Sequence, residues 1–379
     1  MTLEHASRML PVDYDKAILV GRMLLDAGPT PVLLNGGEVI DVSAHAPTVA
    51  DLLELDDIRS LDGPVVCDTP SLMDGSGGHP PILSPIDLQC VKAAGVTFAV
   101  SALERVIEER ARGDADAAQG IRGDLEARIG GGIRSVKPGS REAAELKAAL
   151  IEAGMWSQYL EVAIGPDAEV FTKAPVLSTV GWGADVGIRS DSSWNNPEPE
   201  IVVVATSDGK VVGATLGNDV NLRDFEGRSA LLLGKAKDNN ASTGIGPFIR
   251  LFDGDFTMDT VRDAVVDLRI EGPEGYVLTG TSTMREISRD PEDLVRQALS
   301  EHQYPDGFVL FLGTLFAPVQ DRDEPGRGFT HKPGDVVRIS TPSLGELVNT
   351  VTTSKAAEPW AFGIRDLMRN LARRGLIAA

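Results

Sequence analysis

The chain has 379 residues, 42% of them hydrophobic, which is enough for one large domain and a smaller one. Its formal net charge of −20 opposes binding to nucleic acids or anionic membranes, because both are polyanions. Two cysteines cannot build a disulfide framework or a zinc cluster, and no signal peptide or membrane-spanning apolar run is found, so we expect a cytoplasmic protein.

The first 80 residues predict a small α+β domain. A helix is expected near residues 14–25, and short strands at residues 31–34 and 63–67. The stretch DGSGGHPP at residues 74–81 has the composition of a linker. We therefore place a domain boundary near residue 80 and assign residues 81–379 to a larger second domain.

Residues 106–160 are rich in Ala, Glu and Arg, and they predict helices. Glycines at 130–132 interrupt this segment, and Ser140 is a suitable N-cap for its last part. Two interpretations remain open for this helical insertion. It forms a mobile lid with the glycines as a hinge, or it is a rigid elaboration of the surface.

Two carboxylates lead into an apolar run in the middle of the chain. Glu198 and Glu200 precede residues 201–204, Ile-Val-Val-Val, which predict a buried strand. Because strand side chains alternate, both carboxylates face one side, about 7 Å apart. Such a pair is unfavourable unless a hard divalent cation lies between them. The alternative is a solvated strand edge, on which Pro197 and Pro199 limit pairing.

Asp219 is the candidate for a third oxygen ligand. It lies nineteen residues after Glu200 (219 − 200), in a predicted turn at residues 217–219. A strand, a hairpin and a second strand would bring it beside the two glutamates. Further along come Arg223-Asp224, the phrase Leu-Gly-Lys-Ala-Lys at residues 233–237, and the Gly-Pro pair at residues 246–247.

These pieces, in this order, resemble the core of the fumarylacetoacetate hydrolase family. The resemblance implies that Glu198, Glu200 and Asp219 bind Mg²⁺ or Mn²⁺, and that a lysine contacts the enolate of the substrate. Lys235 and Lys237 both lie near the expected position. The number of residues to the Gly-Pro turn favours Lys237 as the catalytic residue. The match to the Leu-Gly-Lys motif favours Lys235 instead, and we assign Lys235 to substrate binding.

Other segments extend the resemblance to about residues 80–353. The family's Asn-Tyr-x-x-His-x-x-Glu motif aligns with Thr97-Phe98, which places Ser101 at the histidine and Glu104 at the glutamate. Ser101 then becomes a substrate-binding residue and Glu104 a catalytic acid, unless Glu104 is a solvated helix charge. The Phe-x-Lys-x-Pro piece places Lys173 near the site. The Gly-Thr turn of the family aligns with Thr281, a candidate for binding the substrate carboxylate.

The resemblance implies a mixed α/β, β-rich fold with a catalytic β-sandwich or β-roll, assembled as a homo-oligomer (dimer or tetramer). It also implies a small 2-oxo sugar acid as substrate. With Ser101 in place of histidine, a water-activating base is missing, which favours dehydration of 2-keto-3-deoxy-pentonate to 2-oxoglutarate semialdehyde in oxidative pentose degradation. The alternatives are a C–C bond hydrolase of the acylpyruvate or fumarylacetoacetate type, an oxaloacetate decarboxylase, and a non-catalytic sugar-acid binder.

Overall fold

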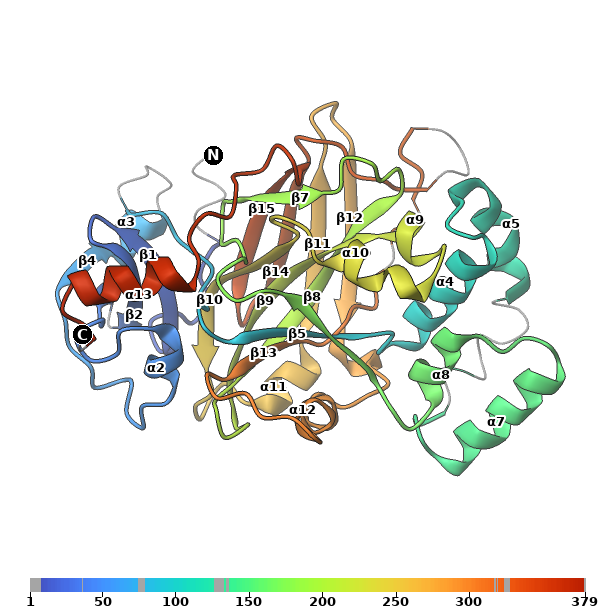
Figure 1. Cartoon of the computed structure of the whole chain (residues 1–379), viewed down its shortest axis with the longest axis horizontal. Helices are drawn as coiled ribbons and strands as arrows, with labels where there is room; N and C mark the ends of the chain where they lie inside the picture. The colour runs from blue at the N-terminus through green and yellow to red at the C-terminus, as the bar shows by residue number, and fades with distance from the viewer. Residues whose placement is uncertain are drawn as a thin grey trace.

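A computed structural model of the chain describes residues 8–377 except for 36, 74–78, 126–132, 134–135, 317, 319 and 324–327. The predicted hinge glycines and most of the predicted linker lie outside the described residues. Figure 1 shows three regions in a row: N-terminal strands at one end, two sheets in the centre, and a group of helices at the other end.

The larger sheet has ten strands in the order β4-β3-β2-β1-β10-β9-β8-β13-β5-β6. Neighbouring strands are antiparallel except for the parallel pair β13 and β5. The bounds are β1 Leu19–Leu25, β2 Gly28–Asn35, β3 Glu38–Asp41, β4 Val65–Asp68, β5 Cys90–Gly95, β6 Glu169–Ala174, β8 Asn195–Ala205, β9 Val211–Leu222, β10 Thr243–Leu251 and β13 Phe308–Phe311.

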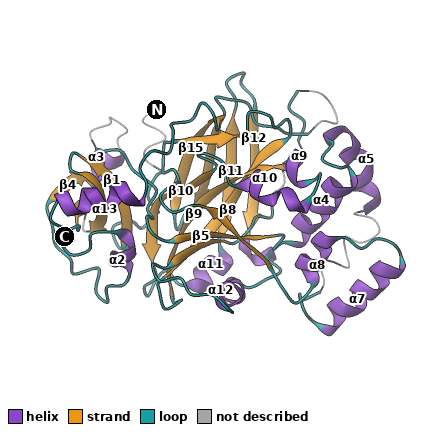
Figure 2. Ribbon diagram, viewed as in Figure 1, coloured by secondary structure: helices purple, strands orange, loops and turns teal. Residues whose placement is uncertain are grey.

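The second sheet has five strands in the order β12-β11-β14-β15-β7. Its strands are β7 Asp185–Ile188, β11 Val265–Glu271, β12 Val277–Thr283, β14 Val336–Thr341 and β15 Gly345–Thr353. Val203 and Leu216 of the first sheet share one hydrophobic core with Ile339 and Leu347 of the second. The two sheets therefore form the layered, β-rich centre that the sequence predicts (Figure 2).

Helices cover the ends and edges of the sheets. They are α2 Val49–Leu53, α3 Thr69–Met73, α4 Ala99–Arg110, α5 Ala115–Leu125, α7 Arg141–Glu152, α8 Gln158–Ile164, α9 Arg223–Glu226, α10 Leu233–Lys237, α11 Met258–Asp263, α12 Pro291–Leu299 and α13 Ile364–Arg373, with 3₁₀ turns η2 Ala230–Leu232 and η3 Met284–Glu286. As predicted, Ser140 caps α7 and accepts a hydrogen bond from the Ala143 N–H. Among the described helices, none is long and apolar enough to cross a membrane.

The helix predicted near residues 14–25 is wrong, because residues 19–25 form strand β1. β1 is hydrogen-bonded along its whole length to the adjacent strand β2 and at residues 19–20 to the distant strand β10, so sheet pairing decides the local structure. The N-terminal strands thus continue the central sheet. The C-terminal helix α13 also returns to them, where Asn370 Nδ2 donates to the Ala27 carbonyl at 2.7 Å. The boundary near residue 80 remains a prediction about the organisation of the chain.

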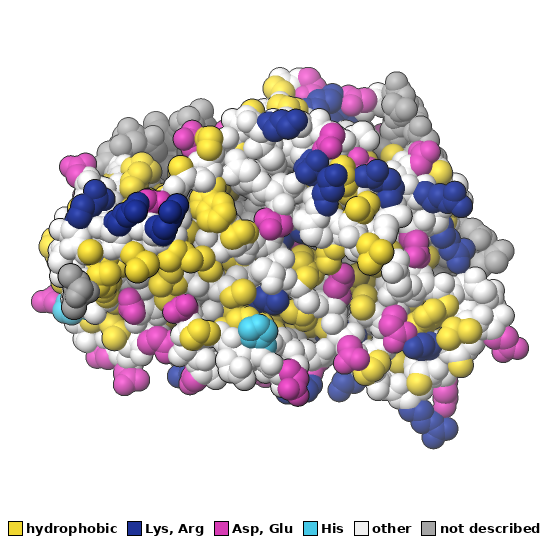
Figure 3. Space-filling model, viewed as in Figure 1, with side chains coloured by type: hydrophobic (Ala, Val, Ile, Leu, Met, Phe, Trp, Pro, Cys, Tyr) yellow, Lys and Arg dark blue, Asp and Glu magenta, His cyan; other side chains and the backbone are white. Residues whose placement is uncertain are grey.

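Acidic side chains are spread over the face shown in Figure 3 and do not gather into one patch. The net charge of −20 is therefore distributed over the surface in this view. Such a distribution favours solubility over the recognition of one basic partner.

Candidate active site

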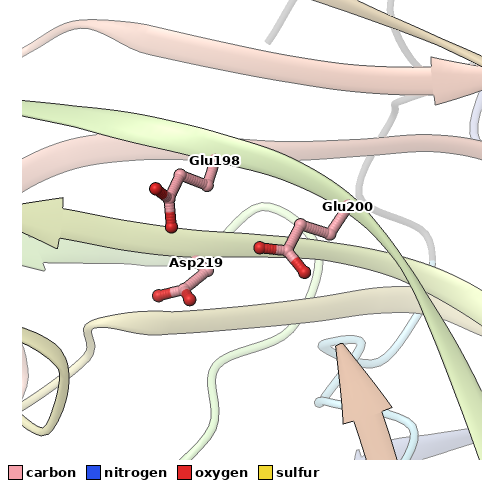
Figure 4. Close-up of side chains that lie close together, drawn as sticks. All are labelled: Glu198, Glu200 and Asp219. Atoms are coloured by element: carbon pink, nitrogen blue, oxygen red, sulfur yellow. The ribbon is translucent and has the colours of Figure 1, made fainter. Parts of the chain in front are cut away.

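The three predicted metal ligands lie on two paired strands. Glu198 and Glu200 belong to β8, and Asp219 belongs to β9, directly opposite Glu198 in the antiparallel register. Residues 217–219 are therefore part of a strand, and the turn predicted there is wrong. Figure 4 shows the three carboxylates pointing toward one another. Each offers one oxygen, and these oxygens all lie within 4.8 Å of one another.

The end of strand β13 leaves room for the pocket. β13 pairs with β8 at residues 202–205, so among the described residues the part of β8 that carries the glutamates pairs with β9 alone. Pro197 and Pro199, which lack an N–H, fit this one-sided pairing. Beyond β13 the chain turns at Gly313, whose N–H donates to Glu200 Oε2 at 2.6 Å.

Lys237 is the lysine that enters the pocket. Its ammonium donates to Glu198 Oε2 at 2.5 Å and to Asp219 Oδ2 at 3.0 Å. Burial would lower the pKa of Lys237, but the charges of Asp219, Glu198 and Glu226 raise it above its ordinary value. Lys237 is therefore a cation in this site, as expected for a residue that stabilises an enolate.

The ligand set suits a hard divalent cation such as Mg²⁺ or Mn²⁺. Burial, followed by the charges of Asp219 and Glu198, raises the pKa of Glu200 well above its usual range. Asp219 Oδ1 is buried and has no hydrogen-bond partner among the described residues, although Lys173 Nζ lies 3.2 Å away. A cation among these oxygens would relieve both the repulsion and the missing partner.

Helices form the opposite wall of the pocket. Ser101 and Arg105 come from α4, and Tyr159 comes from α8. Ser101 Oγ donates to the Thr314 carbonyl. Arg105 donates to Glu198 Oε1 at 2.8 Å and pairs with Glu226 Oε2 at 2.5 Å. The described residues that line the pocket are Ala94, Gly95, Val96, Ser101, Arg105, Tyr159, Glu169, Phe171, Glu198, Glu200, Asp219, Glu226, Ala230, Leu233, Lys237, Gly313 and Thr314.

Glu169 is a pocket carboxyl group without a place among the three predicted ligands. It begins β6 and lies opposite Gly95, where an added Cβ would come within 2.0 Å of Glu169 Oε2. Only a glycine at position 95 leaves the carboxyl group this space. Burial raises the pKa of Glu169, although Arg105 and Lys237 oppose that shift. A half-buried carboxyl group with a raised pKa is better suited than an ordinary one both to accept and to donate a proton.

Three predicted site residues do not line this pocket. Lys173 is fully buried behind it, where Nζ donates to the Ser242 carbonyl at 3.0 Å and faces Asp219. Lys235 is exposed, with its ammonium 5.5 Å from the Phe225 ring centre. Glu104 accepts a hydrogen bond from Arg223 Nη2 at 2.9 Å. Its placement does not support the predicted role as the catalytic acid.

Thr281 also lies outside the pocket lining, and its assignment as a substrate ligand stays a prediction. It is exposed on β12 of the second sheet, where its hydroxyl donates to Asp267 Oδ1 at 3.1 Å. The Gly-Thr pair that does line the pocket is Gly313-Thr314, directly after the buried strand β13. Each Gly-Thr pair comes after a glycine and a short apolar run. The sequence pattern therefore does not distinguish the two pairs, and only the tertiary structure shows which one lines the pocket.

Three charged pocket residues were missed from the sequence: Arg105, Glu169 and Glu226. Arg105 stands among other helix charges, and Glu226 follows the Arg-Asp phrase by two residues (226 − 224). Glu169 lies four residues before Lys173 (173 − 169), so the same segment could have indicated it. Charged residues on helices are usually solvated, and nothing in the spacing of Arg105 and Glu226 marks them as pocket residues.

Comparison with known proteins identifies the family. The model of the Fumarylacetoacetate (FAA) hydrolase C-terminal family matches residues 147–352, more than half of the chain. The chain is 30% identical over 186 residues to a 2-dehydro-3-deoxy-D-arabinonate dehydratase of Saccharolobus solfataricus, covering 48% of this chain and 58% of that protein. It is 32% identical over 205 residues to a probable 2-keto-3-deoxyxylonate dehydratase of Haloferax volcanii, covering 53% and 66%. The chain thus matches less than two thirds of the length of either relative.

Solved structures support the fold. The apo form of a 2-keto-3-deoxy-D-arabinonate dehydratase superposes with a TM-score of 0.65 at 22% identity, covering 88% of this chain and 99% of that one. A fumarylacetoacetate hydrolase from Exiguobacterium antarcticum superposes with a TM-score of 0.54 at 17% identity, covering 89% and 100%. At such low sequence identities these structures establish the fold alone, and the chemistry has to be argued from the residues of the site. With its β-rich fold and the family model matched over residues 147–352, the chain belongs to the fumarylacetoacetate hydrolase family.

Proposed function

We propose that the protein is a metal-dependent dehydratase that converts a 2-keto-3-deoxy-pentonate to 2-oxoglutarate semialdehyde, also named 2,5-dioxopentanoate, in pentose degradation. The observation that carries the proposal is the pocket itself. Three ligand carboxylates, the Lys237 ammonium and the Glu169 carboxyl group face one space, with Ser101 where a hydrolase would need a base.

Glu198, Glu200 and Asp219 would hold the cation, Mg²⁺ or Mn²⁺. When bound, it would supply Lewis-acid polarisation of the 2-keto group and charge balance for the substrate carboxylate. One solved relative, with a TM-score of 0.64 and 23% identity, is a 2-keto-3-deoxy-D-arabinonate dehydratase in complex with magnesium and 2,5-dioxopentanoate. This supports the choice of magnesium and of a five-carbon 2-oxo acid.

Lys237 is the residue that stabilises the enolate. Its ammonium projects from the end of α10 into the ligand cluster, so a 2-keto oxygen placed beside the carboxylates comes within its reach. Removal of a proton from C3 puts negative charge on that oxygen. A fixed ammonium in a buried site stabilises this charge more than water would.

Glu169 moves the protons. As a carboxylate it takes a proton from C3, and as the resulting acid it returns that proton to the C4 hydroxyl, which leaves as water. The C3–C4 double bond forms from the electron pair of the broken C3–H bond. The remaining enone carries its last hydroxyl on C5. It becomes the aldehyde when C5 and its hydroxyl each lose one proton, and C3 and C4 each gain one. One half-buried carboxyl group of raised pKa serves these transfers.

Ser101 favours dehydration over hydrolysis. Its hydroxyl donates to the Thr314 carbonyl, so it is engaged as a donor. A neutral serine cannot hold the proton of an attacking water at neutral pH. The two curated relatives named above are both described as dehydratases, which supports the same reaction class.

The test is a product assay with two substrates. Purified protein with Mg²⁺ is incubated with 2-keto-3-deoxy-pentonate and, separately, with an acylpyruvate, and the semialdehyde and pyruvate are measured. We expect semialdehyde from the first substrate and no pyruvate from the second. Pyruvate from the second without semialdehyde from the first would exclude the dehydratase and favour a C–C bond hydrolase.

A further inference from the structure

Glu226 lies beside the Lys237 ammonium and is not one of the three predicted metal ligands. Glu226 Oε1 lies 3.7 Å from Lys237 Nζ, too far for a hydrogen bond, and it has no hydrogen-bond partner among the described residues. Two of the three N–H groups of the ammonium are used by Glu198 and Asp219. The third N–H is therefore available to this free oxygen.

The position of the Glu226 carboxylate is well defined by its neighbours. Its second oxygen, Oε2, pairs with Arg105 Nη1 at 2.5 Å. Its backbone carbonyl accepts a hydrogen bond from the Tyr159 hydroxyl at 3.0 Å. The whole residue is only 4% exposed, at the end of the short helix α9 that follows β9. Glu226 Oε1 is thus held in place as a buried acceptor.

Lys237 and a divalent cation require the same carboxylate groups. The ammonium contacts Glu198 Oε2 and Asp219 Oδ2, and both residues belong to the ligand set. A divalent cation bound by these carboxylates repels an ammonium at such short range, because both positive charges are buried. Lys237 must therefore withdraw from the ligands and still remain in the pocket. A shift of about 1 Å brings it within hydrogen-bond distance of Glu226 Oε1.

We propose that Glu226 is a positioning residue that receives the Lys237 ammonium when the metal binds. The contact removes a competing cation from the ligands and fixes Lys237 beside them. Metal binding and the orientation of Lys237 are then coupled through one carboxylate. The consequence for catalysis rests on the proposed function, but the coupling itself concerns only the cation, Lys237 and Glu226.

The test is a double-mutant cycle on Mg²⁺ affinity, measured by titration calorimetry on the full chain. Wild type, Glu226→Gln, Lys237→Met and the double variant are compared. We expect Glu226→Gln to weaken Mg²⁺ binding roughly tenfold, since the ammonium keeps competing for the ligands. Lys237→Met should bind Mg²⁺ at least as tightly as wild type. In that background Glu226→Gln should change the affinity less than twofold.

Glu108→Gln is the matched control. Glu108 Oε2 accepts from the same Arg105 at 2.7 Å and is also buried, but Glu108 forms no ion pair with Lys237 in the described structure. Loss of the Glu108 charge should change the Mg²⁺ affinity by the same factor in wild type and in the Lys237→Met background. If Glu226→Gln weakens binding equally in both backgrounds, Glu226 acts only through its charge and the proposal is wrong.

Glu226→Asp covers the case in which the amide variant fails to fold. It keeps the charge but withdraws the carboxylate from Lys237, and the loss of affinity should again disappear with Lys237→Met. Persistence of that loss without Lys237 would overturn the proposal. A cycle that behaves as expected in a protein without dehydratase activity would refute the proposed function and leave the coupling in place. Dehydratase activity in a protein whose Mg²⁺ affinity shows no coupling between Glu226 and Lys237 would support the proposed function and refute the role proposed for Glu226.

Discussion

The two walls of the pocket are built in different ways. On the strand side, Glu198, Glu200 and Asp219 are fixed by the backbone register of β8 and β9. On the helical side, Arg105 and Glu226 are held by side-chain ion pairs between α4 and α9. On the sheet, the spacing of residues along neighbouring strands sets the positions of the ligands. On the helices, the charged side chains are positioned by contacts that form only in the folded chain. Substitutions on the two walls should therefore have different consequences.

The largest effect is expected on the strand wall. Glu200→Gln keeps the size of the side chain and an acceptor for the Gly313 N–H, but it removes a ligand charge. We expect dehydratase activity to fall by about a thousandfold or more, because a Lewis acid contributes several kcal/mol to the barrier. Circular dichroism should remain that of wild type. EDTA should have the same effect, and added Mg²⁺ should reverse it.

Asp208→Asn is the matched control for that experiment. Asp208 lies in the turn between the same two strands, where it accepts hydrogen bonds from the Thr206 hydroxyl and the Lys210 N–H. It is far along the hairpin from the ligands, so its substitution should leave the activity within twofold of wild type. Full turnover by thoroughly chelated protein would contradict the metal-dependent mechanism.

Glu169→Gln should give the next largest loss, because general acid–base catalysis contributes about 10²-fold to 10⁴-fold. The amide cannot take the C3 proton, yet Mg²⁺ binding should remain. Glu104→Gln distinguishes this assignment from the one based on the family motif. Glu104 lies in an ion pair with Arg223 and outside the pocket lining, so kcat should change much less. The opposite ranking of the two variants would restore Glu104 as the acid.

The same contrast explains what the sequence could predict. Glu198, Glu200 and Asp219 lie within one strand pair, so spacing and alternation made them candidates, and the resemblance to the family implied that they bind one metal. The strands predicted at residues 31–34 and 63–67 also overlap β2 and β4, since each is a short run rich in apolar residues. Lys237 followed from its distance to the Gly-Pro turn, and the structure brings it to the ligands.

The rest depended on contacts between distant segments. Arg105 and Glu226 are 121 residues apart (226 − 105), and nothing local marks either one as buried. Thr281 and Thr314 follow similar glycine and apolar patterns, but β12 is an edge strand of the second sheet and β13 ends at the pocket. Likewise β1 was predicted as a helix, because its pairing with β10 is more than two hundred residues away in the chain.

Lys237→Met should lower kcat by roughly a hundredfold, the scale of losing one charge contact to an oxyanion. Lys235→Met is its control, since Lys235 lies two residues earlier on the same helix and is exposed over Phe225. It should retain nearly full activity. Normal activity of Lys237→Met with an inactive Lys235→Met would mean that α10 presents the other lysine to the substrate.

The smallest effect is expected at Ser101, on the helical wall. Its hydroxyl donates to the Thr314 carbonyl and so connects α4 to the turn that carries Gly313. Ser101→Ala removes one neutral hydrogen bond, worth about 1 kcal/mol, and kcat/KM should fall about fivefold or less. The Mg²⁺ affinity should not change, because Gly313 still donates to Glu200. A hundredfold loss in kcat would show that the hydroxyl itself contacts the reacting atoms, and the helical wall would then contribute chemistry as well as position.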